Sequence, residues 1–168
     1  MKKIISLTLF LALASALAGA VLAYVNSITF PIIEEQKIAA VKASLQEIFP
    51  TASDFSEVST FTDASGLVDN VYEATGSGYA IKVSVQGYKD VITFLVGFDN
   101  NDKIVGFKVT ALNDTPGIGS KVGEEAFANS IVGKTITDQL DTIAGATISS
   151  AAAIKGIDAA IAVYQSLK

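Results

Sequence analysis

The residues best suited to chemistry lie in one short segment, Asp141–Ser150, which reads Asp-Thr-Ile-Ala-Gly-Ala-Thr-Ile-Ser-Ser. This run of small residues leads into the start of a predicted final helix. Gly145 and Ala146 allow another group to approach the backbone closely, and a helix N-terminus offers free N–H groups and a positive dipole to a phosphate. The Ser and Thr side chains at such a place also cap a helix. On the residue pattern alone, capping is the favoured interpretation and phosphate binding is the alternative.

A second segment of interest is Asp114–Gly119, which reads Asp-Thr-Pro-Gly-Ile-Gly. Pro116 fixes its own φ and presents Gly117 in a tight turn. Gly117 and Gly119 leave backbone amides uncovered, so that a flat ring or its polar edge could lie against them. Pro-Gly turns are common, and on its own the segment indicates a surface turn between a strand and a helix.

The composition excludes several classes of function. The 168 residues contain no Cys and no His, which removes thiolate and imidazole metal sites and Ser-His-Asp or Cys-His catalysis. All twelve basic residues are Lys, and the net charge is −5, so nucleic-acid binding is not expected. We therefore predict no metal site and no catalytic side chain, and any redox chemistry would need a borrowed cofactor.

The N-terminal region has the composition of a membrane anchor. Ile4–Ala23 is a run of twenty residues without a charge, long enough to span a bilayer as a helix. Lys2 and Lys3 would keep the N-terminus in the cytoplasm. A cleaved signal peptide is the alternative, because Ala16–Ala20 resembles a small-residue cleavage site. The uncharged run continues beyond a usual signal core, which favours a retained anchor, and both interpretations export the domain.

The rest of the chain alternates in patterns typical of an α+β domain. We predict an anchor and stalk over residues 1–33 and an extracytoplasmic domain over residues 34–168, with an antiparallel sheet flanked by helices. The predicted helices cover Glu34–Phe49, Lys121–Ser130 and Ser149–Leu167, and the predicted strands cover Val71–Thr75, Tyr79–Val85, Val91–Phe98 and Ile104–Leu112.

The first segment resembles the covalent flavinylation motif of the FMN-binding domain family, Asp-x-x-(Ser/Thr/Ala)-Gly-Ala-(Thr/Ser)-x-(Ser/Thr). The family includes the RnfG subunit of Rnf complexes and the NqrC subunit of sodium-pumping quinone reductases. In that family a flavin transferase attaches FMN through its phosphate to the Thr hydroxyl, and the matching residue here is Thr147. The resemblance assigns the rest of the signature to Asp141, Gly145, Ala146 and Ser149. Ala144 stands where the family most often has Ser.

The second segment resembles the Glu-Thr-Pro-Gly-Leu-Gly loop of the same proteins, which lies against the bound flavin. Asp114 replaces the Glu and Ile118 replaces the Leu. The resemblance implies cofactor contacts along the whole loop, from Asp114, Thr115, Pro116, Gly117, Ile118 and Gly119. Tyr88 and Lys121 are further candidates, although packing and simple exposure are the ordinary interpretations of these two residues.

Together the resemblances imply an electron relay that carries one FMN, rather than a catalyst acting alone. In an Rnf-type complex it would pass electrons between ferredoxin and NAD, with export of Na⁺ or H⁺. Its partners would be the other membrane subunits and a flavin transferase for maturation. Three alternatives remain open: an NqrC-like subunit, a stand-alone flavinylated carrier, and a non-redox anchored binding domain without a cofactor.

Overall fold

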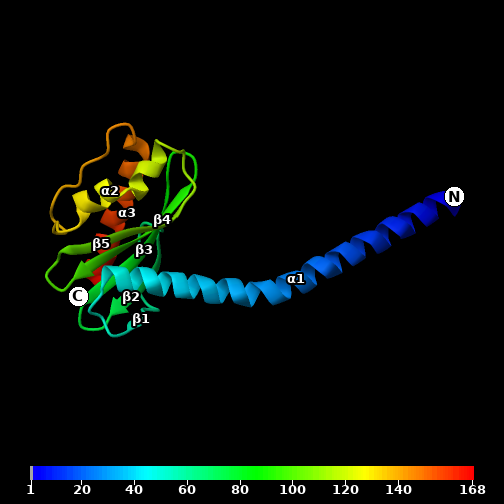
Figure 1. The fold of residues 1–168 in the computed structure, drawn as a ribbon, viewed down its shortest axis with the longest axis horizontal. Coiled ribbons are helices and arrows are strands. Elements are labelled where there is room, and N and C mark those ends of the chain that lie inside the picture. The colour runs from blue at the N-terminus through cyan, green and yellow to red at the C-terminus, as the bar shows by residue number, and fades with distance from the viewer. Residues whose placement is uncertain (1) are drawn as a thin grey trace. The chain divides into compact units, whose positions relative to one another are not determined.

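The computed structural model describes residues 2–168, in which α1 is one uninterrupted helix from Lys2 to Ile48 (Figure 1). The chain divides into two units, a helical segment up to Ala40 and a compact unit from Val41 to Lys168. The predicted helix Glu34–Phe49 is the last part of α1 and is continuous with the anchor, with Pro31 inside the helix. The helix ends before Phe49 and Pro50, because the residue ahead of a proline is disfavoured in helical geometry. The predicted boundary between residues 33 and 34 stays a prediction.

Two of the described helices are long and apolar enough to cross a membrane. One is α1, whose most apolar window is entirely unburied, and its large apolar side chains from Ile4 to Ile33 are exposed. The other is α3, Thr147–Ser166, whose window is 44% buried inside the domain. Because the core accounts for the apolar face of α3, α1 is the candidate span.

The compact unit is built on a five-stranded antiparallel sheet in the order β1-β2-β3-β4-β5. The alternating runs of the sequence predicted the last four strands and their antiparallel pairing, and the structure confirms them within three residues at each end. β1 was not predicted. The strands are β1 Phe55–Glu57, β2 Val68–Ala74, β3 Gly78–Gln86, β4 Val91–Asp99 and β5 Ile104–Leu112.

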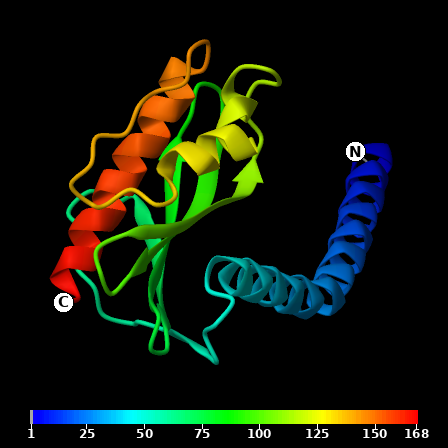
Figure 2. The same ribbon diagram turned by 60° about the vertical axis from the view of Figure 1, so that its left-hand side comes forward.

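Both faces of the sheet are covered. α3 and α2, Glu125–Ile131, pack on one face and enclose the main core, which includes Phe94, Phe127 and Tyr164 (Figure 2). The end of α1 and the turn after it cover the other face with a smaller cluster around Leu45 and Phe49. The fold is α+β with helices flanking an antiparallel sheet, as predicted.

Two helix predictions need correction. The predicted helix Lys121–Ser130 is two elements, the 3₁₀-helix η1 at Gly119–Gly123 and then α2. The final helix begins at Thr147, two residues before the predicted start, so Thr147 occupies its first turn. Both shifts bring the segments of interest to the ends of helices, where backbone amides lack helical partners.

Candidate functional site

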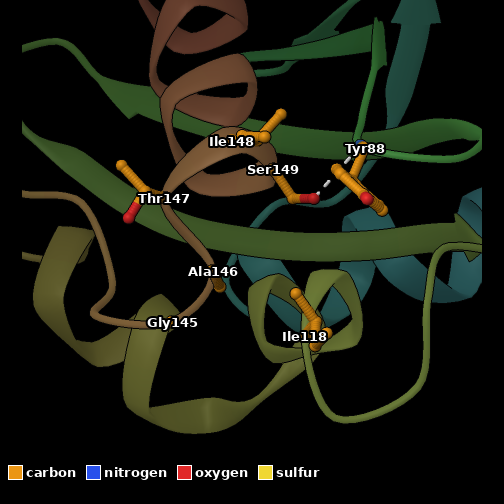
Figure 3. A pocket seen from close by; sticks show the side chains of 7 residues that line it. All are labelled: Tyr88, Ile118, Gly145, Ala146, Thr147, Ile148 and Ser149. Carbon is orange, nitrogen blue, oxygen red and sulfur yellow. Dashed lines mark hydrogen bonds between the residues drawn. The ribbon is translucent and has the colours of Figure 1, made fainter.

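A pocket of about 350 Å³ lies at the N-terminal end of α3 (Figure 3). Three segments that are far apart in the sequence form it: the turn between β3 and β4, the loop after β5, and the first turn of α3 with the residues before it. Its lining residues are Tyr88, Ile118, Gly145, Ala146, Thr147, Ile148 and Ser149. The structure therefore brings both segments singled out in the sequence to one place.

Thr147 presents an unpaired hydroxyl at this pocket. It is the first residue of α3, its side chain is exposed, and among residues 2–168 its hydroxyl has no hydrogen-bond partner. The N-cap is Ala146, and none of the side chains that the structure describes caps the helix. The favoured interpretation from the residue pattern, that the Ser and Thr side chains cap this helix, is therefore wrong.

The backbone at the start of α3 is also open. The ladder of helical hydrogen bonds begins with the Ser150 N–H, which donates to the Ala146 carbonyl at 2.9 Å. The amides of Thr147, Ile148 and Ser149 precede it and have no acceptor within the helix. Three N–H groups and the positive end of the helix dipole thus lie beside the Thr147 hydroxyl, an arrangement that suits a phosphate.

Ser150 fixes the approach to this helix end. Its hydroxyl accepts the Ile143 N–H at 3.0 Å and donates to the Ala146 carbonyl at 2.9 Å. Gly145 has a φ of +81°, a left-handed conformation that glycine adopts without strain. The buried Ser150 and the turn at Gly145 hold the segment so that Thr147 points outward.

The rim of the pocket is apolar and exposed. Tyr88 is 59% exposed, Ile118 47% and Ile148 59%, although each side chain is large and apolar. Contiguous exposed apolar surface beside a pocket is typical of a binding site. The Thr147 hydroxyl and the free amides lie at the same pocket, so the site combines an apolar wall with a polar, phosphate-suited end.

Asp114 lies behind the pocket and does not line it. Only 6% of this residue is exposed, and its carboxylate accepts four hydrogen bonds. Oδ2 accepts the Ser149 hydroxyl at 2.6 Å and the Tyr88 N–H at 3.1 Å. Oδ1 accepts the N–H groups of Lys89 at 3.0 Å and Thr115 at 2.7 Å. The predicted contact residue is thus turned toward the interior.

The surroundings of Asp114 favour the charged carboxylate. Burial alone would raise its pKa, but the hydrogen bonds from Ser149 and from the Thr115, Lys89 and Tyr88 amides together hold the pKa below its usual range. A Cβ at Gly87 would lie 2.5 Å from Oδ2, and one at Gly119 would overlap the carboxyl group itself. Glycine is needed at both positions because the carboxylate fills the space.

The remaining predicted residues of the segment Asp114–Gly119 belong to the loop after β5. Gly117, with a φ of +74°, forms the expected turn with Pro116, and its N–H donates to the Ser120 hydroxyl. Thr115 accepts the Ile118 and Ser120 amides through its carbonyl. Of these residues, the structure places only Ile118 in the wall of the pocket.

Lys121 and Asp141 line a neighbouring hollow of about 260 Å³ instead. Lys121 Nζ lies 3.5 Å from the Ala144 carbonyl, so this side chain contacts the segment that precedes Thr147. Asp141 is exposed and lies outside the pocket that contains Thr147.

Sequence reasoning missed Ile148 as a site residue, and it gave Ser150 only a capping role. Ile148 fills a variable position of the flavinylation motif, so the resemblance gave it no role. A signal was present, because Ile148 falls on the opposite side of the helix from Ile154, Ile157 and Ile161. An apolar residue away from the core stripe of a helix is a candidate for a binding surface.

Comparison with known proteins found a matching family model and several similar proteins. Residues 87–162 match the FMN-binding domain family. The G subunit of the Na⁺-translocating ferredoxin:NAD⁺ oxidoreductase complex of Acetobacterium woodii is 29% identical, over 99% of this chain and 94% of its own length. The G subunit of the ion-translocating oxidoreductase complex of Photorhabdus laumondii is 29% identical, over 88% of this chain and 83% of its own length.

One solved structure has a looser likeness. The C subunit of the Na⁺-translocating NADH-quinone reductase of Parabacteroides distasonis is 21% identical with a TM-score of 0.45, over 60% of this chain and 58% of that one. The family match at residues 87–162 covers the β3–β4 turn, the loop after β5 and most of α3, so the part of the chain that forms the pocket is similar to FMN-binding domains.

Proposed function

We propose that this chain carries one FMN, joined through its phosphate to the hydroxyl of Thr147, and that it relays electrons in an Rnf-type complex. The observation that carries the proposal is the exposed, unpaired Thr147 hydroxyl at the edge of the pocket. A flavin transferase would join the Thr147 oxygen to the phosphorus of an activated flavin donor while the P–O bond to the donor's leaving group breaks and the hydroxyl proton departs, so the chain would gain the mass of FMN less one water.

The residues around Thr147 suit the phosphate end of the cofactor. The free amides at the start of α3 and the helix dipole stabilise negative charge. Lys121 adds a cation near Gly145, where its Nζ lies 3.3 Å from the position that a Cβ would take. The negative charge of Asp114 does not line the pocket, and the hydrogen bonds that its carboxylate accepts offset part of this charge.

The rest of the pocket suits a flat ring. Tyr88, Ile118 and Ile148 would cover apolar ring surface that is otherwise in water. When bound, FMN supplies reversible transfer of one or two electrons. The chain's own contribution is to hold the cofactor, to exclude water from one side of it, and to keep it from dissociating.

The helix α1 and the relatives support a place for this relay in a membrane complex. We propose that α1 crosses the membrane once, with Lys2 and Lys3 on the cytoplasmic side and the domain outside the cytoplasm. The two relatives compared above are both named as G subunits of ion-translocating complexes. They support an Rnf-type complex over the NqrC-like alternative, with the other subunits as redox partners and Na⁺ or H⁺ as the translocated ion.

The attachment is tested by separating the chain on a denaturing gel and recording flavin fluorescence, after co-expression with a flavin transferase. The wild-type chain and Thr147→Ser should fluoresce, because both offer a hydroxyl, and Thr147→Ala should lose the signal completely. Thr142→Ala is the matched control, since it removes a neighbouring exposed hydroxyl. A fluorescent Thr147→Ala band would reject the attachment point.

The place in a complex is tested by affinity purification from native membranes in mild detergent. Co-purification of integral-membrane redox subunits supports the relay. Recovery of the flavinylated chain alone would favour the stand-alone carrier, and recovery of an unmodified chain would favour the non-redox binding domain.

A further inference from the structure

Asp114 cannot bind a cofactor in the arrangement that the structure shows. A carboxylate offers about four acceptor positions, and all four are used, by Ser149, Thr115 and the amides of Tyr88 and Lys89. The group is also buried and enclosed by Gly87 and Gly119. The function of Asp114 must therefore lie in the segments that its hydrogen bonds connect.

The hydrogen bonds of Asp114 join three segments of the pocket. The Thr115 bond lies in the loop after β5, the Tyr88 and Lys89 bonds reach the β3–β4 turn, and the Ser149 bond reaches the first turn of α3. The Tyr88 N–H is shared with the Ser149 hydroxyl at 3.3 Å, so turn and helix are also joined directly (Figure 3). Asp114, which does not line the pocket, and Ser149, which does, together join these segments, and the pair is here called the Asp114–Ser149 clamp.

The clamp determines where Tyr88 stands relative to Thr147. Ser149 lies two residues after Thr147 on the same helical turn, and it is 1% exposed. The backbone of Tyr88 is held by the clamp, while its ring stays exposed at the rim of the pocket. Because Tyr88 is 59% exposed, packing covers less than half of the residue, and the bonds to its backbone fix the place from which the ring projects.

We propose that the Asp114 carboxylate and the Ser149 hydroxyl position Tyr88 over one side of the cofactor ring, so that Tyr88 shields the ring from solvent. This rests on the proposed FMN site at Thr147. It assigns Ser149, a member of the modification signature, a role inside the fold instead of on the surface that a transferase would read.

The first test needs no cofactor. The full-length chain in detergent micelles, produced in cells without a flavin transferase, is examined by hydrogen exchange resolved at residues 87–90. The Tyr88 and Lys89 amides should be protected in the wild-type chain. Ser149→Ala should speed exchange at Tyr88 about tenfold, as expected for one lost hydrogen bond to a polar network. Ser166→Ala, which removes a serine bond to the Val163 carbonyl at the far end of α3, should leave it unchanged.

The second test uses the flavinylated chain and measures quenching of flavin fluorescence by iodide, which reports solvent access. Tyr88→Ala should raise quenching, Ser149→Ala should raise it in the same direction, and Ser166→Ala should not. If the Asp114→Asn variant folds, its iodide quenching is measured as well. If it does not fold, the result for Ser149→Ala alone tests the shielding role.

The outcomes separate the two proposals. A wild-type Tyr88 amide that exchanges like an exposed loop amide would overturn the clamp, whether or not FMN is attached. Unchanged iodide quenching in Tyr88→Ala or Ser149→Ala would overturn its shielding role. A wild-type chain without flavin, from cells that contain the transferase, would reject the proposed function, and the exchange experiment would still decide whether the clamp exists.

Discussion

The two segments that meet at the pocket are built in opposite ways. The loop after β5 turns its charged group inward, where Asp114 is buried and every acceptor position is filled. The segment before α3 turns its hydroxyl outward, where Thr147 is exposed and unpaired beside free amides. A residue that lies close to the pocket is therefore not necessarily a residue that binds the ligand. The closed segment shapes the site, and the open one has groups available for a ligand.

The comparison predicts that substitutions in the closed segment reduce stability, whereas substitutions in the open segment do not. The largest effect is expected for Asp114→Asn. The amide retains the size of the side chain, but its NH₂ group faces N–H donors and leaves them unpaired. The free energy of unfolding of the unflavinylated chain should fall by about 3 kcal/mol.

Chemical denaturation monitored by circular dichroism would measure this loss, with Thr147→Ala as the matched variant from the open segment. Thr147→Ala should change the free energy of unfolding by no more than about 0.5 kcal/mol, because its hydroxyl has no partner to lose. Equal losses in the two variants would remove the distinction between the segments.

Gly119→Ala should have the next largest effect. Its new methyl group would overlap the carboxyl group of Asp114, which is held in place by four hydrogen bonds. We expect a loss of about 2 kcal/mol in the free energy of unfolding, as for other overpacked interiors. In Gly123→Ala the methyl meets only the flexible end of Leu112, and the change should stay below about 1 kcal/mol. A Gly119→Ala variant that is as stable as wild type would show that Gly119 does not tightly enclose the carboxyl group of Asp114.

A smaller change in the free energy of unfolding is expected at acidic pH. Because its pKa is lowered on folding, Asp114 stabilises the fold fully above the usual aspartate range, and this contribution is lost as the pH falls through the lowered pKa. The stability difference between wild type and Asp114→Asn should therefore be smaller at pH 3 than at pH 7. Denaturation curves at the two pH values test this, and the other aspartates with lowered pKa, among them Asp63 and Asp99, act equally in both proteins. A difference that does not depend on pH would contradict the assigned ionisation.

Much of the fold could be predicted because hydrophobic periodicity reports on it directly. β2 to β5 are runs of seven to nine residues rich in Val, Ile, Phe and Tyr, and they were found within three residues at each end. β1 has only three residues, too few for an alternation to be visible. Only Glu124 separates η1 from α2, and the residues around it do not indicate a break in the helix.

The site was only partly predictable for a different reason. Thr147 belongs to a local pattern, and its segment could be singled out from the sequence. The inward direction of Asp114 depends on partners 26 and 35 residues away, Tyr88 and Ser149. No local pattern reports such contacts, so a buried positioning group and a ligand contact look the same in sequence.

The most direct test of the central claim is the intact mass of the chain purified from its native host, with peptide mapping of residues 141–155. The account predicts a gain of one FMN less one water, located on Thr147. An unmodified chain from cells that contain the flavin transferase would contradict it and would favour an anchored binding domain without redox function.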